Sequence, residues 1–338
     1  MRKATLLAVI LLAAAAGAFA IPADVTYTDG DNTLRLKSGK TQDVQVGDKM
    51  NTGDTLRTDA DGLAELDQGG VTIKISGGTV FTLMEREAGG KTQTVLSMAL
   101  GSIKYKYGKI SGSEPAVRTN GAVAGVRGTE ITVFSGADGS TLFAVDSGQV
   151  TVEAEGKSVD LAANQGVEVP LGQPPGDVIP LQSRQIDYSK WNDDRFASML
   201  ADPLAAMANV ETAMDGYIKA VEENSSGYDT SSKQLAVERD KVRQVAAQQG
   251  KDAASKYEQE VALPLSLTTG HYFLNMRYNA LAALSLRRFV AGRLYLFMKA
   301  RSMAGGNSEE WTAFLSKYND LLGKFETSIV PHLVPVDI

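Results

Sequence analysis

The chain has 338 residues, with 40 acidic and 34 basic side chains, a net charge of −6 and no cysteine. The acidic balance argues against nucleic-acid binding, which depends on an excess of Lys and Arg. The lack of cysteine excludes disulfides, thiol catalysis and zinc–thiolate sites. A chain of this length can bury a sufficient core without cross-links, and the length predicts two domains.

The N-terminus has the pattern of an export signal. Arg2 and Lys3 precede an apolar run of 17 residues, Ala4 to Ala20, which ends on Ala18-Phe19-Ala20. Small residues at these last positions suit signal peptidase. We therefore expect a signal peptide at 1–20 and a periplasmic or otherwise extracytoplasmic protein. The run also meets the lower length limit for a bilayer span, so an uncleaved anchor is the alternative. We expect no transmembrane span after this segment.

Residues 21–172 alternate between apolar and polar side chains. Val71, Ile73 and Ile75 fall on one face, with Thr72 and Lys74 on the other. Such segments recur every 8–12 residues, bounded by turn signals such as Asp61-Gly62 and Gly77-Gly78. This period of two with frequent glycine turns predicts an all-β sandwich or roll.

Four motifs stand out within this half. They are Gly47-Asp48 followed by Gly53-Asp54, Gly62-Leu63-Ala64-Glu65-Leu66, Val117-Arg118-Thr119 and Val126-Arg127-Gly128-Thr129. As an ordered set they resemble the FecR domain family over about residues 24–170. The resemblance implies that Gly47, Asp48, Gly53, Val126, Gly128 and Thr129 are structural motif positions. It also implies an extracytoplasmic domain used for binding or scaffolding.

The signalling role of the family is not expected here. Its named member transmits a ferric-citrate signal to a cytoplasmic sigma factor, through a segment that precedes a membrane span. In this chain, only Met1, Arg2 and Lys3 precede the apolar run. We therefore expect no sigma-factor contact.

Two groups are candidate binding residues. Arg127 has a planar fork suited to a carboxylate or to backbone carbonyls, so it either reads a ligand or has an internal partner. Gly128 suits a backbone conformation that other residues avoid. A strand from Ser102 to Lys109 would place Ile103, Tyr105 and Tyr107 on one face and Lys104 and Lys106 on the other. These tyrosines and lysines could hold an anionic glycan; the alternative is tyrosines in the core and lysines in solvent.

The period changes after residues 173–182, a Pro- and Gly-rich stretch that we expect to be a linker. Residues 183–338 have helical periodicity and predict an antiparallel bundle of four helices. The first is broken by polar residues 224–232, and the second covers about 233–261. Pro264 and Gly270 interrupt the chain, the third helix spans about 271–303, and the fourth begins at Ser308 and ends before Pro331. The fold class is thus α+β with segregated domains.

Charge is uneven along the helical half. Residues 183–260 carry 14 acidic and 10 basic side chains, whereas residues 261–308 carry six bases and no acid. We expect the basic stretch to pack beside acidic helices. The alternative is contact with anionic lipid or an acidic polymer.

Catalytic motifs are absent from the sequence. The two histidines, His271 and His332, lie in the helical half, and neither G-x-S-x-G nor H-E-x-x-H occurs. Neighbouring acids such as Glu85 and Glu87 are typical of solvated strand faces. We expect no cofactor, no metal and no enzymatic activity. The sequence favours an envelope binding or scaffolding protein whose partner is an unknown envelope protein or glycan. The alternatives are a carbohydrate- or peptidoglycan-binding module and a cell-wall enzyme.

Overall fold

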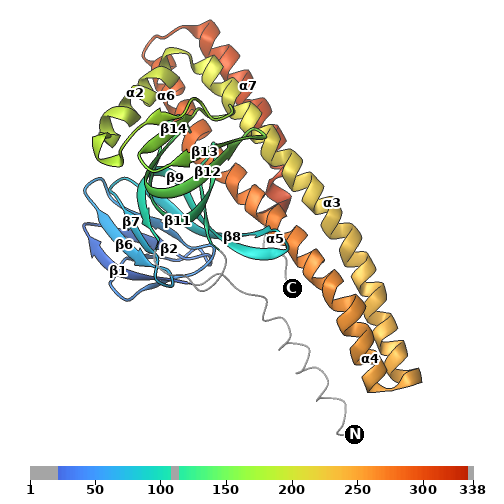
Figure 1. Cartoon of the computed structure of the whole chain (residues 1–338). Helices are drawn as coiled ribbons and strands as arrows, with labels where there is room; N and C mark the ends of the chain where they lie inside the picture. Colours follow the sequence, from blue (N-terminus) through green and yellow to red (C-terminus); the bar gives the residue numbers. More distant parts are fainter. Residues whose placement is uncertain (1–21, 108–113, 334–338) are drawn as a thin grey trace.

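The computed structural model describes residues 22–107 and 114–333, with Arg127 described by its backbone alone. The signal-peptide prediction, including Ala18-Phe19-Ala20, lies outside these residues, as do Gly108 and Lys109. All described strands precede all long helices along the chain (Figure 1), which confirms the segregated α+β class.

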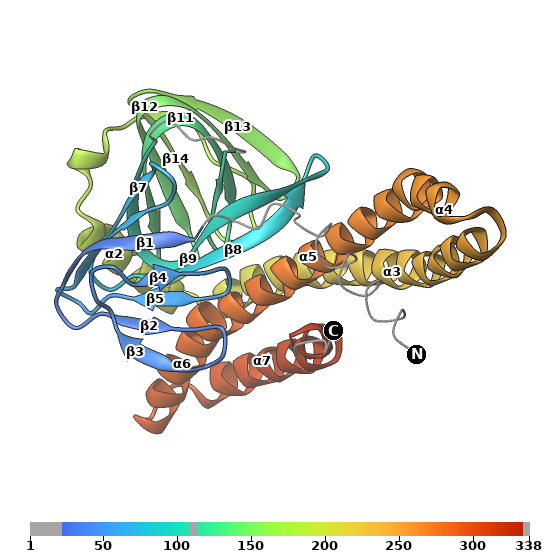
Figure 2. The same cartoon turned by 90° about the horizontal axis from the view of Figure 1, so that it is seen from below.

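The strands join into one continuous sheet. They are β1 (Ala23–Asp29), β2 (Thr33–Arg35), β3 (Thr41–Asp43), β4 (Lys49–Met50), β5 (Thr55–Arg57), β6 (Leu63–Asp67), β7 (Thr72–Ile75), β8 (Val80–Ala88), β9 (Lys91–Lys106), β10 (Ala116–Arg118), β11 (Val123–Ser135), β12 (Thr141–Ala154), β13 (Lys157–Ala162), β14 (Gln165–Val169) and β15 (Ile179–Pro180). The first half of β9 pairs with β8, and its second half pairs with β7 and β11. Because β9 changes partners along its length, the sheet curls into a closed roll (Figure 2).

The alternation predicted from the sequence fills the inside of this roll. Val71, Ile73 and Ile75 are buried, while Lys74 between them is exposed. Each strand contributes alternate side chains to the core because successive residues point to opposite faces of a sheet.

The helical region divides differently from the four helices predicted. Its elements are η1 (Ser183–Gln185), α2 (Tyr188–Ala201), α3 (Pro203–Gln249), α4 (Lys251–Tyr257), the π-helical turn η2 (Glu258–Ala262), α5 (Leu263–Leu286), the π-helical turn η3 (Arg287–Ala291), α6 (Gly292–Met303), α7 (Ser308–Ser328) and η4 (Val330–His332). The predicted break at 224–232 is wrong, since α3 is continuous for 47 residues. The fourth predicted helix is confirmed by α7.

The predicted interruption at Pro264 and Gly270 is also wrong. Pro264 lies in the first turn of α5, where a missing N–H is tolerated, directly after the wider turn η2. Gly270 lies inside α5, with open space where a Cβ would be. The chain from Lys251 to Met303 therefore forms one return helix against α3.

The base of this hairpin differs from its distal part. At the base, α7 packs across α3 and α6, and Phe314, Leu321 and Phe325 join a core with Met214 and Leu286. Beyond the end of α7, α3 and the return helix are the only helices among the described residues. They project past the β roll as a two-helix arm (Figures 1 and 2), which we define as residues 222–275.

The two halves share apolar contacts. Tyr188 and Trp191 of α2 pack on Phe134 of β11. Tyr278 of α5 joins a small cluster with β-roll residues, and Leu171 belongs to the helical core. The stretch expected to be a linker, 173–182, includes β15, which pairs with β14.

The basic stretch makes few of the expected ion pairs. Arg301 pairs with Glu310 at 3.3 Å, whereas Arg287 stacks on Phe325 at 5.0 Å. Acids of α3 are instead paired by lysines of α7, as in Lys317 with Glu211 at 3.0 Å. Among the described residues, the acids of α3 that pair with another helix are therefore paired with bases of α7 rather than with bases of the basic stretch.

Candidate functional site

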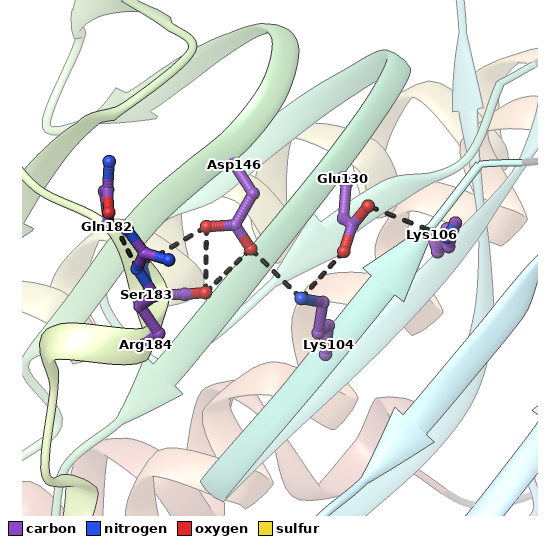
Figure 3. Close-up of polar contacts among 7 residues, drawn as sticks. All are labelled: Lys104, Lys106, Glu130, Asp146, Gln182, Ser183 and Arg184. Atoms are coloured by element: carbon purple, nitrogen blue, oxygen red, sulfur yellow. Dashed lines mark hydrogen bonds and ion pairs between the residues drawn. The ribbon is translucent and has the colours of Figure 1, made fainter.

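One predicted group, Lys104 and Lys106, lies in a polar network on the outside of the roll (Figure 3). Lys104 of β9 contacts Glu130 of β11 at 2.7 Å and Asp146 of β12 at 3.2 Å. Lys106 lies 3.9 Å from the other oxygen of Glu130. These residues come together because β11 pairs with both β9 and β12, which aligns same-face side chains of three strands.

The network also holds the chain where it leaves the β roll. The Ser183 hydroxyl lies 2.8 and 2.7 Å from the two carboxylate oxygens of Asp146, and the Ser183 N–H donates to one of them at 3.2 Å. Arg184 donates to Gln182 at 2.9 Å beside it (Figure 3). A shallow hollow of about 380 Å³ opens over these groups.

The charges in this network are mutually satisfied. The hydrogen bond to Glu130 raises the pKa of Lys104 despite the opposing effect of burial. Partial burial would raise the pKa of Asp146, but hydrogen bonds from Ser183 and the contact with Lys104 leave it below its usual range. Lys104 therefore stays protonated and has no lone pair for attack, and the oxygens of the ionised Asp146 are occupied by Ser183 and Lys104. The network stabilises the segment at Ser183, where the chain leaves the β roll; we refer to it as a brace.

The predicted tyrosines do not share this surface. Tyr105 is fully buried in the core, and burial raises the pKa of its phenol. Tyr107 is half-buried and packs against the same core. The strand thus has lysines outside and tyrosines inside, which leaves Tyr105 unavailable for stacking on a glycan. The Arg127 side chain lies outside the described residues, so its assignment remains a prediction.

The motif glycines have structural positions. Gly47 and Gly53 adopt φ of +94° and +93°, and Gly128 adopts φ of +58°, a region that favours glycine. Asp48 accepts a hydrogen bond from the N–H of Gln45 at 2.9 Å within the same turn. Val126 and Thr129, on either side of the bulge at Gly128, are buried. The positive φ of Gly128 is a conformation that residues with a side chain adopt only with strain.

A second site was not predicted from the sequence. Arg118 of β10 is only 3% exposed and lies between two rings, with its guanidinium carbon 4.9 Å from the centre of Tyr217 on α3 and 4.5 Å from that of Tyr278 on α5. It lines a cavity of about 670 Å³ between the roll and the arm's base. The sequence marked Val117-Arg118-Thr119 as a motif but did not indicate these ring contacts, because the rings are about 100 and 160 residues away along the chain.

Features of other site classes are not seen in the described residues. Across 22–107 and 114–333, no cluster of three His, Asp or Glu side chains is arranged to hold a metal ion. Within the same ranges, no helix combines the length and hydropathy required to cross a bilayer.

One comparison with known proteins matches part of the β roll to a family model. No curated protein matches the chain. Two crystal structures of a "putative anti-sigma factor" from Parabacteroides distasonis, at 1.65 and 2.50 Å, are similar at 16% identity and a TM-score of 0.33. Each match covers 38% of this chain and 61% of that chain. The family model described as FecR protein matches residues 54–165. The β roll of this chain therefore carries a FecR domain, as its motifs predicted.

Proposed function

We propose that the protein is a non-enzymatic scaffold of the cell envelope, in which the FecR-containing roll supports a helical arm that binds an envelope protein. The observation that carries this proposal is the thin core of the arm. From residue 222 to the end of α3, the buried side chains are Ser231, Leu235 and Glu238. The base of α3 instead buries Met207, Val210 and Met214.

The arm also leaves large apolar side chains in solvent. Leu263 and Leu267 are 38% and 51% exposed and lie one turn apart on one face of α5. Val237 of α3 is 53% exposed. Glu238 next to it accepts a hydrogen bond from Tyr257 of the return helix at 2.6 Å, so Val237 lies nearer the tip of the arm than Leu263 and Leu267. Free apolar side chains on a two-helix hairpin favour coverage by another helix.

The position of α7 at the base indicates which kind of element would cover the exposed apolar side chains of the arm. Here α7 lies along α3, with contacts from Lys317 to Glu211 and finally from Ser328 to Glu222. Past Glu222, the same two helices continue without a third among the described residues. We infer that an amphipathic helix of the partner occupies this position, because helix-in-groove binding uses apolar residues spaced by one turn.

One further point supports the envelope assignment, and another supports a non-enzymatic role. The N-terminal run at 1–20 has the export pattern given above. The charged groups of the Lys104 network are paired in a brace, while His271 and His332 lie on separate elements, α5 and η4. These arrangements favour a binding role over catalysis.

The test is site-specific photocrosslinking of the full-length protein in intact envelopes. A photoreactive residue at Val237 or Leu267 should give one discrete adduct. The same residue at Leu296, which is 67% exposed at the base, or at Tyr27, which is 49% exposed on the roll, should give none. Leu263→Glu should abolish the adduct at Val237. Adducts only from the roll, or adducts insensitive to Leu263→Glu, would show that the arm is not the docking surface.

A further inference from the structure

Arg118 is held more firmly than a surface arginine. Its guanidinium is stacked between Tyr217 and Tyr278, which come from two different helices, and the Tyr217 hydroxyl donates to the Asn120 carbonyl at 2.7 Å. The two ring centres lie 4.9 and 4.5 Å from the guanidinium carbon, and the Tyr217 side chain also hydrogen-bonds to the guanidinium. A planar guanidinium has five N–H donors, so others remain for a ligand. The fork is therefore fixed in orientation before any ligand arrives.

Within the part of the chain that the structure describes, the positive charge of Arg118 has no carboxylate partner. Among the described residues, no Asp or Glu oxygen lies within 4.0 Å of its guanidinium, whereas Lys104 and Lys317 are both paired. Burying a charge without a counter-ion is unfavourable, and two rings compensate only part of the lost hydration. An anion entering the cavity would complete the set of interactions.

Amide side chains line the same cavity as the arginine. Asn120, Asn275 and Asn279 line the cavity, with Asn224 further along α3. Asn120 is 3% exposed and is fixed by bonds to the Ala99 carbonyl at 2.9 Å and the Ser285 hydroxyl at 3.0 Å. Amides beside an arginine suit a ligand that carries hydroxyl or amide groups next to its anionic group.

The charged side chains that line the cavity restrict the net charge of a suitable ligand. The lining includes three bases, Arg86, Arg118 and Lys157, and three acids, Glu87, Glu153 and Glu155. Glu153 and Glu155 are exposed at the β12–β13 turn, so they face anything that enters. Acids there disfavour a multiply charged phosphate more than a single carboxylate.

We propose that the cavity between the β roll and the arm's base binds a small organic monocarboxylate carrying hydroxyl or N-acyl groups, with Arg118 binding its carboxylate in the plane of the fork. A volume of about 670 Å³ exceeds a single ion and fits a ligand of one sugar or a short N-acyl amino acid. This site is separate from the docking surface proposed for the distal arm.

Calorimetric titration of the purified protein tests the proposal. The probes are N-acetylmuramic acid, glucuronic acid and N-acetylalanine, with N-acetylglucosamine as a neutral analogue and inorganic phosphate as a multiply charged one. At least one carboxylate should bind about 10–100-fold more tightly than either comparison probe, the range expected for a charge-assisted pair. The best probe would distinguish an acidic sugar from an N-acyl amino acid.

A matched pair of glycine variants separates binding from folding. Gly216 lines the cavity on α3, and Gly323 lies on α7 away from it; an added Cβ meets no atom within 4 Å at either. Gly216→Leu should block the cavity and reduce affinity at least tenfold with the melting temperature maintained, because Leu favours a helix over Gly. Gly323→Leu should leave affinity unchanged.

Arg118 variants give the direct chemical test. Arg118→Lys retains the charge but loses the planar fork, and Arg118→Met loses both, so affinity should fall in that order. If none of the three carboxylates binds at about 10 mM, the proposal is overturned, because this concentration is near the dissociation constant of the weakest specific sites. Binding that is unaffected by Gly216→Leu would overturn it as well, even if the Arg118 variants fail to fold.

Discussion

The bulge that contains the FecR motif permits a quantitative test with three glycine-to-alanine variants. Gly128 of β11 has φ of +58° and open space where a methyl group would be, whereas Gly148 of β12 has φ of +84°. A Cβ at Gly148 would lie 2.7 Å from the carbonyl oxygen of Gly128 and 3.0 Å from Cα of Thr129. Gly125 of β11 has neither a positive φ nor a neighbour within 4 Å.

These differences set an order of destabilisation. Gly128→Ala should lower the free energy of unfolding by about 1–2 kcal/mol, the penalty of a left-handed L-residue. Gly148→Ala adds a backbone clash, for which overpacking costs about 1–3 kcal/mol, so the total is about 2–5 kcal/mol. Gly125→Ala should be neutral or stabilise by about 0.5–1 kcal/mol, because glycine weakens a strand interior.

Urea unfolding followed by circular dichroism of the whole chain measures the three values. Equal m-values across the variants would show that the unfolded states are comparable. If Gly148→Ala is no more destabilising than Gly125→Ala, the bulge does not require its glycines and the reasoning fails. Gly128→Val should cost on the order of 1–3 kcal/mol, and an unchanged melting temperature would reopen a ligand role for the motif.

Three other predictions concern separate parts of the chain. Leu171→Ala should lower stability by about 2–5 kcal/mol in denaturant titrations, since this buried side chain joins the roll to the helical core; a change below about 0.5 kcal/mol would contradict that role. The folded protein lowers the pKa of Asp146, so this carboxylate stabilises the fold at pH values above its unfolded-state pKa and stops doing so as the pH falls through its folded-state pKa. Asp146→Asn should therefore weaken the loss of thermal stability on acidification below about pH 4. An unchanged pH dependence in this variant would refute the prediction. N-terminal sequencing of the protein from a periplasmic fraction should begin at Ile21, whereas Met1 in a membrane pellet would indicate an anchor.

The β half was more predictable from sequence than the helical half. A strand with one buried face produces a strict alternation, and Ile73 and Val152 follow it because each points into the roll. The break predicted at 224–232 failed for a physical reason. Asn, Ser and Gly have low helix propensity, but each costs only about 0.5–1 kcal/mol, and a continuing helix avoids a new nucleation step.

How far each candidate site could be predicted from the sequence depended on whether its contacts are between residues close together along the chain. The separation of Lys104 from Tyr105 onto opposite faces follows from strand geometry, and the structure shows it. The partners of Lys104 could not be predicted, because Glu130 and Asp146 meet it only through the pairing of three strands. For Arg118, the sequence gave even less indication of the partners of its side chain. Its environment is created by two helices that pack on the roll after a long stretch of intervening chain.

The length of α3 gives the molecule the properties of a lever. From Tyr217, where the helix meets Arg118, to its end at Gln249 there are 32 residues, or about 48 Å of rigid helix. A tilt of about 5° at Tyr217 moves the end of the helix by about 4 Å, close to one turn of the partner helix that we propose there. Tyr278 of the return helix packs on the same arginine, so a tilt of one helix at this point would be shared by the other. A small change in the width of the gap around Arg118 would then give a larger displacement at the far end of the arm.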